Sequence, residues 1–210
     1  MKRKRSSRPG RPNARHAAAP QGGKLRVIGG EFRRRQLPVP DRPGLRPTLD
    51  RVRETLFNWL GQRLDGERVL DAFAGTGALG IEALSRGAAQ VTFIEQDSRA
   101  ATQLERNLAT LKADGGRVLS TDARAFLEAG NAGEPFDLVL LDPPFHQGWV
   151  SACCADLERG GWLAAGARIY LEAEATLMPA VPGSWLLHRQ ADAGDTAARL
   201  YQRLGPGQPV

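Results

Sequence analysis

Cysteine is scarce in this sequence, with only Cys153 and Cys154 among 210 residues. Adjacent cysteines do not form an ordinary disulfide with each other, and no neighbouring ligands complete a metal site around them. We therefore expect two reduced packing residues and no bound metal.

Long hydrophobic runs are also missing. No apolar segment approaches the length that spans a bilayer, and the basic N-terminus lacks the apolar stretch of a signal peptide. These absences predict a cytoplasmic protein with no membrane partner. A chain of this length can bury one substantial core, so we expect one folded domain.

Acidic residues are absent from the first 23 positions, which hold seven lysines and arginines. Positions 24–53 hold nine basic and three acidic residues, whereas the rest of the chain holds thirteen basic and twenty acidic ones. The net charge of +6 is therefore concentrated in the first quarter of the chain. We expect residues 1–23 to be a disordered basic tail, either merely solvated or attracting phosphates nonspecifically.

The most informative stretch is Asp142-Pro143-Pro144-Phe145, which follows the apolar run 136–141. Such a run is typical of a strand buried on both faces of a parallel sheet, and ligands bind outside the carboxyl ends of these strands. The prolines favour an extended backbone whose carbonyl oxygens point outward, so that oxygens and the Phe145 ring together suit a nucleobase amine. In isolation, the same residues are more typical of a turn that ends a strand.

A second motif begins at Asp71, at the end of an expected strand over 68–71, and continues through a glycine-rich turn into a helix over 78–86. Gly75 and Gly77 let the backbone approach a ligand closely. With Gly80 they also satisfy the dinucleotide-binding fingerprint. The carboxylate of Asp71 disfavours a pyrophosphate, however, and suits a ligand with an amino group and a sulfonium.

Two further acids follow expected strands. Glu95 follows 91–94, where an acid can bind a ribose diol, and Asp122 follows 117–121, where it can face an adenine amine. Each acid alone is more typical of a helix N-cap, above all Asp122 before an expected helix over 123–127. The ordered set, completed by Asp71 and Asp142, favours one ligand site.

The structured part of the basic region contains two expected short strands, 24–28 and 35–39, around Gly29-Gly30. They predict a hairpin that carries Arg33, Arg34 and Arg35.

A helix should follow, capped by Thr48 and packed through a stripe formed by Val52, Leu56, Trp59 and Leu60. That stripe would leave Arg51 and Arg53 outside the core, where they contact RNA or form a salt-bridged helix surface. A further helix over 149–158 and strands over 168–172, 185–189 and 198–203 complete the expected fold.

Segments 71–77 and 142–145 resemble motifs I and IV of the class I S-adenosylmethionine-dependent methyltransferases that modify exocyclic amines. Segments 25–30, 43–48 and 50–60 are similar to the RsmD family of bacterial small-subunit ribosomal RNA guanine-N2 methyltransferases. The similarity runs from about Leu25 to about Arg203, and the arginine-rich block makes it specific to the family.

The resemblance implies an α/β, Rossmann-like fold with a seven-stranded, mostly parallel sheet flanked by helices, its last strand antiparallel, and an N-terminal β-hairpin extension. Residues 24–64 would be an RNA-binding extension and 65–205 the methyltransferase domain. The implied activity is methyl transfer from S-adenosyl-L-methionine to N2 of guanine 966 of 16S ribosomal RNA. The partner would be that RNA, within a 30S subunit or an assembly intermediate, and the enzyme a monomer.

The motif matches assign three sets of residues. The catalytic set is Asp142, Pro143, Pro144 and Phe145; the cofactor-binding set is Asp71, Phe73, Gly75, Gly77, Glu95, Asp122 and Ala123; the RNA-binding set is Arg33, Arg34, Arg46, Arg51 and Arg53.

Three other functions are compatible with parts of the sequence. A nicotinamide-dependent oxidoreductase would use the glycine fingerprint, but Asp71 and segment 142–145 disfavour it. A noncatalytic RNA-binding protein would need only the basic region. An adenine-N6 DNA methyltransferase also uses Asp-Pro-Pro followed by an aromatic residue, but its additional target-recognition segment has no obvious room here.

Overall fold

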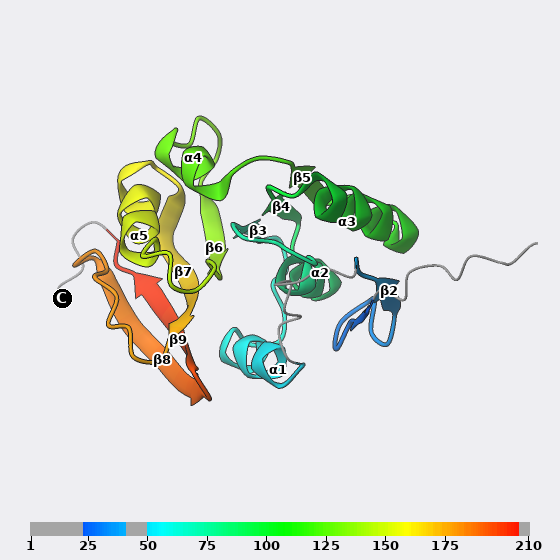
Figure 1. Ribbon diagram of the computed structural model, residues 1–210, viewed down its shortest axis with the longest axis horizontal. Helices are drawn as coiled ribbons and strands as arrows, with labels where there is room; N and C mark the ends of the chain where they lie inside the picture. The colour runs from blue at the N-terminus through cyan, green and yellow to red at the C-terminus, as the bar shows by residue number, and fades with distance from the viewer. Residues whose placement is uncertain (1–22, 41–49, 206–210) are drawn as a thin grey trace, which may run out of the picture.

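The computed structural model describes residues 23–40 and 50–205 (Figure 1). The basic tail, apart from Gly23, and the predicted residues Arg46 and Thr48 lie outside these ranges. The helices are α1 (Asp50–Trp59), α2 (Ala78–Ser85), α3 (Ser98–Leu111), α4 (Ala123–Glu128) and α5 (Val150–Arg159). The strands are β1 (Lys24–Arg26), β2 (Gln36–Pro38), β3 (Arg68–Asp71), β4 (Gln90–Ile94), β5 (Gly116–Leu119), β6 (Phe136–Leu141), β7 (Leu163–Glu174), β8 (Trp185–Ala193) and β9 (Thr196–Arg203).

The main sheet has seven strands in the order β5-β4-β3-β6-β7-β9-β8, and β1 and β2 form a separate antiparallel hairpin. Strands β3 to β7 pair in parallel, whereas β9 runs antiparallel to both β7 and β8. The predicted fold class is therefore confirmed, including the antiparallel last strand and the N-terminal hairpin.

Helices cover both faces of the sheet. One apolar core joins α1, α2 and α3 to the sheet and the hairpin, and a second joins α4 and α5 to the opposite face. The central strands β3 and β6 are almost wholly buried between these layers, which explains their continuous apolar sequences. Cys153 and Cys154 are buried, unbridged residues of α5, as predicted. Within the described ranges, no helix is long and apolar enough to cross a membrane.

Strands β7 and β8 differ most in extent from the prediction, whereas β1, β2 and β5 are shorter than predicted. Strand β7 starts at Leu163 and ends at Glu174, and β8 continues to Ala193, because both pair along most of their length with neighbours that the periodicity of one strand does not reveal. Helix α3 was not predicted at all. Its N-cap is Asp97, whose side chain accepts hydrogen bonds from the backbone N–H groups of Arg99 and Ala100.

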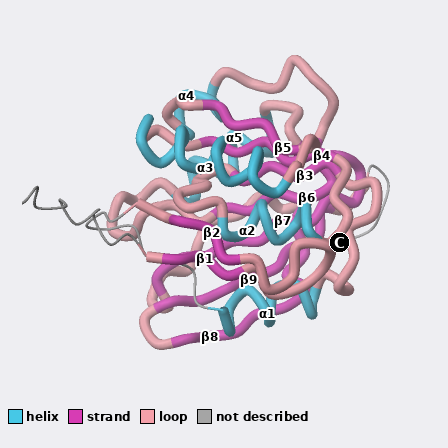
Figure 2. The backbone as a smooth tube through the Cα atoms, turned by 90° about the vertical axis from the view of Figure 1, so that its right-hand side faces the viewer, coloured by secondary structure: helices cyan, strands magenta, loops and turns pink. Residues whose placement is uncertain are grey.

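The hairpin is docked on α2 (Figure 2, in which both lie in front of the sheet). The Glu31 N–H donates to the Ser85 carbonyl at 2.7 Å, the Phe32 N–H to Ser85 Oγ at 2.9 Å, and Ser85 Oγ to the Gly29 carbonyl at 2.5 Å. Gly30 has φ +71°, and a Cβ there would lie 1.7 Å from the Ser85 carbonyl oxygen. The hairpin is thus fixed to the helix that follows the glycine-rich turn.

The predicted surface position of Arg53 is wrong. Arg53 is only 1% exposed, because the buried residues of α1 are Arg53, Leu56 and Phe57, one position round from the predicted stripe. The guanidinium donates to the Arg26 carbonyl at 2.9 Å and to Asp50 Oδ1 at 2.5 Å, and it lies 3.7 Å from Glu82. Arg53 therefore ties the hairpin to α1 and α2.

Glu82 is the centre of this buried cluster. It is fully buried in α2 and accepts hydrogen bonds from the backbone N–H groups of Ile28 and Gly29 at 2.9 and 2.7 Å. Arg86 also donates to it, at 2.9 Å, and stacks on the Phe57 ring. One carboxylate thus holds the hairpin backbone and balances two buried guanidiniums.

Candidate active site

The predicted acids meet at one edge of the sheet. Strand β3 lies between β4 and β6, and Asp71 is in register with Phe93 and Leu140. Because these strands are parallel, their carboxyl ends bring Asp71, Glu95 and Asp142 to the same side of the molecule.

Asp71 acts on the glycine-rich turn. It is 2% exposed, and its Oδ2 accepts a hydrogen bond from the Gly80 N–H of α2 at 3.0 Å. The pKa of Asp71 is raised to about 7, chiefly by burial and to a smaller extent by the nearby Glu95, although the Gly80 hydrogen bond opposes this shift. The carboxyl therefore organises the junction between β3 and α2, and direct contact with a ligand stays a prediction.

The turn itself requires its glycines. Gly75 and Gly77 have φ +53° and +76°, and a Cβ on Gly77 would lie 2.3 Å from Leu104 Cδ1. The Gly77 N–H donates to the Ala74 carbonyl at 2.7 Å, which closes the turn. Substitution at Gly77 would therefore combine backbone strain with a clash.

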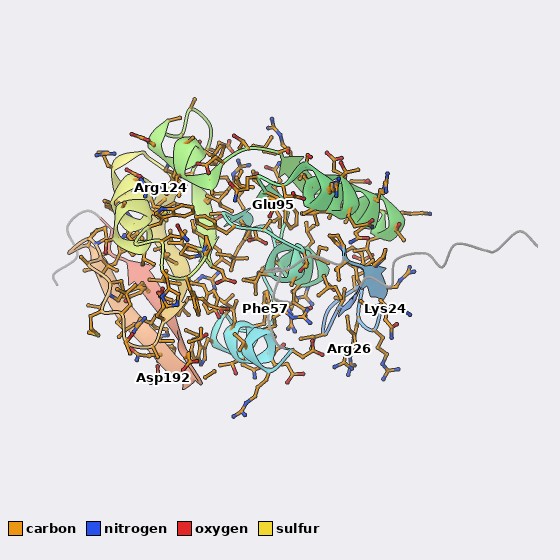
Figure 3. The ribbon with its side chains drawn as sticks, viewed as in Figure 1. Lys24, Arg26, Phe57, Glu95, Arg124 and Asp192 are labelled. Atoms are coloured by element: carbon orange, nitrogen blue, oxygen red, sulfur yellow. The ribbon has the colours of Figure 1, made fainter. Side chains whose placement is uncertain are left out.

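Glu95, labelled in Figure 3, connects this turn to the end of β4. Its Oε2 accepts a hydrogen bond from the Gly75 N–H at 2.8 Å, and its Oε1 accepts one from the Asp97 N–H at 2.7 Å. The cap of α3 is Asp97, so the helix-cap interpretation of Glu95 does not apply. A partly buried carboxylate beside a glycine turn fits the hydroxyl groups of a ribose.

We expect Glu95→Ala to weaken S-adenosylmethionine binding by roughly 1 to 3 kcal/mol, because two acceptor oxygens for the ribose hydroxyls would be lost. Isothermal titration calorimetry measures this directly. Glu105→Ala is the matched control, since Glu105 is an exposed acid on the following helix α3. Equal dissociation constants for the two variants would show that Glu95 only supports the turn.

The remaining predicted cofactor residues have structural roles in the fold. Asp122 caps α4, with Oδ1 accepting from the Ala125 N–H at 2.8 Å, so its N-cap role is confirmed. Ala123 is buried in the first turn of that helix. Phe73 packs against Trp149, with ring centroids 6.4 Å apart. For these residues, contact with a cofactor stays a prediction.

Segment 142–145 leaves the sheet directly after β6. Pro143 is buried and Pro144 exposed, while Asp142 and Phe145 are partly buried. The following residue, His146, has φ +61°, and its backbone N–H donates to the Glu174 carboxylate. That bond holds the loop after Phe145 to the end of β7.

Asp142 lies in a strongly acidic setting. Burial raises its pKa well above the ordinary value, and the charges of Glu172 and Asp71 raise it further. The sequence analysis did not single out Glu172, Tyr170 or Glu174. Their only sequence signal is that two acids, at positions 172 and 174, end an apolar strand beside β6.

The predicted RNA-binding arginines have different surroundings. Arg33, Arg34 and Arg51 are exposed, and among the described residues none of them forms an ion pair. Their contact with RNA stays a prediction. Arg53 is buried and leaves the predicted set, and Arg46 lies outside the described residues. Figure 3 shows the hairpin residues Lys24 and Arg26 on the opposite side of the molecule from Asp192 of β8.

Comparison with known proteins agrees with this geometry. Residues 25–202 match the family model described as "Conserved hypothetical protein 95". A protein of Escherichia coli K12 named "Ribosomal RNA small subunit methyltransferase D" is 52% identical over 187 residues, which cover 89% of this chain and 93% of the relative. The chain belongs to the RsmD family.

Other RsmD relatives extend the match. The Haemophilus influenzae protein of the same name is 43% identical over 86% of this chain and 94% of its own length. A solved structure, "Putative methyltransferase yhhF from Escherichia coli", superposes with a TM-score of 0.80 at 50% identity, covering 87% of this chain and 99% of that one. The fold is that of the class I methyltransferases.

Proposed function

We propose that this protein transfers a methyl group from S-adenosylmethionine to the exocyclic N2 of a guanine in small-subunit ribosomal RNA. The observation that carries the proposal is the pairing of two motifs. Asp142-Pro143-Pro144-Phe145 follows β6, and the glycine-rich turn follows the neighbouring strand β3, so a base amine and a cofactor can meet at one edge. The names of the RsmD relatives supply the small-subunit RNA.

The residues of the turn suit the cofactor. The glycines allow a ligand to approach the backbone closely, and the Glu95 carboxylate can accept hydrogen bonds from ribose hydroxyls. Asp71 holds the turn to α2 by accepting a hydrogen bond from the Gly80 N–H. When bound, S-adenosylmethionine supplies an electrophilic methyl group on a sulfonium. The protein therefore has mainly to position the acceptor nitrogen.

Guanine N2 is a weak nucleophile because its lone pair is delocalised into the ring. We infer that Asp142 and the Pro143 carbonyl accept the two N2 hydrogens, which favours a pyramidal nitrogen with its lone pair directed at the methyl group. The partly buried Phe145 ring would stack on a base turned out of its helix. As the nitrogen becomes cationic, both oxygens stabilise it more than they stabilise the ground state.

The RNA-binding surface in this proposal consists of Arg33, Arg34 and Arg51, together with Arg46. The first three are exposed on the hairpin turn and on α1. By family resemblance, the target is guanine 966 of 16S ribosomal RNA, in a 30S subunit or an assembly intermediate, and the enzyme acts as a monomer.

We expect Arg51→Ala or Arg46→Ala to lower the rate at saturating RNA more than deletion of residues 1–23 does. The tail holds seven basic residues and no acid, so its loss should weaken RNA binding and flatten the salt dependence while sparing the maximum rate. An arginine beside the site would affect the orientation of the base as well. Salt-dependent binding and single-turnover rates distinguish the two effects.

Arg189→Ala is the control for this comparison, because Arg189 is exposed on β8, far from the hairpin in the chain and at the edge of the sheet. If tail deletion abolished turnover and the Arg46 and Arg51 variants behaved like Arg189→Ala, recognition would depend on the tail.

Purified protein tests the proposed reaction. We expect labelled methyl groups from S-adenosylmethionine to enter small-subunit RNA and to be recovered as N2-methylguanosine after digestion to nucleosides. N6-methyladenosine would instead indicate the adenine-modifying alternative, and RNA binding without transfer would indicate a noncatalytic protein. Thermal protection by a nicotinamide cofactor, and none by S-adenosylmethionine, would indicate the oxidoreductase alternative.

A further inference from the structure

A second acid lies beside Asp142. Strands β6 and β7 are parallel, with Leu140 in register with Tyr170 and Leu141 with Leu171. Continuing the register by one residue places Asp142 next to Glu172, with both side chains on the sheet face that carries Leu140 and Tyr170. The proposed catalytic acid thus has a carboxylate neighbour on the adjacent strand.

Glu172 is deeply buried and held in place. It is 7% exposed, and its Oε1 accepts a hydrogen bond from the fully buried Tyr170 hydroxyl at 2.6 Å. Its register partner on β9, Ala198, is apolar. Glu172 is therefore not an ordinary solvent-exposed acid. Burying a carboxylate without a positive partner is costly.

The described residues that face the pair supply no positive charge. From β3 comes Asp71, which is also acidic and bonded to the Gly80 N–H; from β7 comes Tyr170, a neutral donor. Among the described residues, no lysine, arginine or histidine forms an ion pair with either Asp142 or Glu172. Two such carboxylates in a setting of low polarity do not both ionise readily.

The titration of the pair follows from these surroundings. Burial raises the pKa of Asp142 and of Glu172, and the Glu172 charge raises the pKa of Asp142 further. The Tyr170 hydroxyl opposes the shift at Glu172 by stabilising its anion. The pair therefore keeps a proton to higher pH than two isolated carboxyls would.

We propose that Glu172 is a positioning residue for methyl transfer, which gives the Asp142–Glu172 pair a single negative charge before the reaction and lets the pair take up the proton that the methylated nitrogen releases. This inference rests on the proposed function, in which Asp142 contacts the guanine amine.

The step balances. The N2 lone pair forms the new N–C bond, the S–CH3 bond breaks, and its electrons stay on sulfur, which becomes a neutral thioether. The nitrogen is then cationic and loses one proton to Asp142. As positive charge develops, the proton already shared by the pair can reside on Glu172, which leaves Asp142 as the anion that faces the nitrogen. After the product leaves, the pair returns one proton to water.

Glu172→Gln tests the inference through the pH dependence of the single-turnover rate at saturating RNA. The amide keeps an acceptor for the Tyr170 hydroxyl and removes the neighbouring negative charge. The pair then ionises once instead of twice, so the change in rate at which the wild-type pair loses its second proton should be absent from the variant's profile, whereas the acidic limb should keep its position. Glu172→Asp should keep the second ionisation, and the RNA KM should change little in both variants.

Glu158→Gln is the matched control, because Glu158 is a partly buried acid of α5 bonded to Arg203 and Trp185. It should leave both ionisations of the profile in place. A Glu172→Gln profile that is lower in rate but keeps the second ionisation would overturn the inference. Asp142→Asn distinguishes this result from a failure of the proposed function. Near-normal turnover in that variant would show that Asp142 itself takes no part in the mechanism.

A stability measurement decides the matter if Glu172→Gln does not fold. A carboxyl whose folded pKa is raised makes the protein less stable as pH rises from the unfolded pKa through the folded one, since the unfolded chain ionises first. The melting temperature of the wild type should therefore fall more steeply than that of Asp142→Asn between about pH 5 and pH 8. Asp71 contributes to both slopes and cancels in the comparison. Equal slopes would contradict the shared proton.

Discussion

Asp142→Ala should lower the rate of methyl transfer at saturating RNA by about 10²- to 10³-fold, the usual effect of removing one preorganised group that stabilises charge in the transition state. The carboxyl is used chiefly when the nitrogen becomes cationic, so substrate binding should change much less than the rate. Single-turnover kinetics with labelled S-adenosylmethionine measures the rate, and calorimetry measures cofactor affinity.

The fold should survive this substitution. Burial and neighbouring carboxylates raise the pKa of Asp142, so at neutral pH the carboxyl costs the folded state free energy that its removal relieves. We therefore expect a melting temperature at pH 7 that is equal to or above that of the wild type. Near-normal turnover at saturating RNA would refute the assigned role, and a large loss of stability would show that Asp142 supports the fold instead.

Glu82→Gln should destabilise the protein by roughly 3 to 5 kcal/mol, because it leaves the buried Arg86 guanidinium without its carboxylate and the buried Arg53 with Asp50 alone. Glu82 is fully buried between Arg53 and Arg86 and accepts two backbone N–H groups from the hairpin. Denaturant-induced unfolding measures the change in free energy. RNA affinity should fall as well, since the hairpin is held to α2 through this residue.

Asp65→Asn is the control for Glu82, because Asp65 forms an ion pair with Arg63 on the surface. Screening by solvent should make its effect small. A Glu82→Gln variant with the unfolding midpoint of Asp65→Asn would mean that the buried cluster adds nothing to stability.

Much of the fold was predictable because its signals are local. The apolar runs of β3 and β6 and the glycine turn after Asp71 each occupy a few consecutive residues. Their order along the chain is enough to place the acids at one sheet edge, since parallel strands share their carboxyl ends. The family resemblance then supplied the strand count and the antiparallel last strand.

Arg53 could not be placed in this way. A helix stripe predicted from apolar residues cannot include an arginine, yet Arg53 is the first buried residue of the stripe. Its burial depends on Glu82, 29 positions later in the chain, and on the Arg26 carbonyl. Such a charge pair is visible only once α1 and α2 are packed together.

Helix α3 and Glu172 illustrate two other limits. The helix carried usable signals, namely the Asp97 cap and buried Leu104, Leu108 and Leu111 at helical spacing, so local reasoning could have found it. Glu172 carried only the signal of an acid near the end of an apolar strand, because its meaning comes from its strand neighbour Asp142, 30 positions earlier. Register between distant strands is not encoded in either strand alone.

Mapping methylated guanines in ribosomal RNA tests the central claim most directly. RNA would be compared from cells that lack this protein, cells that regain it, and cells that regain the Asp142→Ala form. We predict that one N2-methylguanine of the small-subunit RNA disappears with the protein, returns with the wild type and does not return with the variant. An unchanged set of N2-methylguanines in the cells that lack the protein would contradict the account.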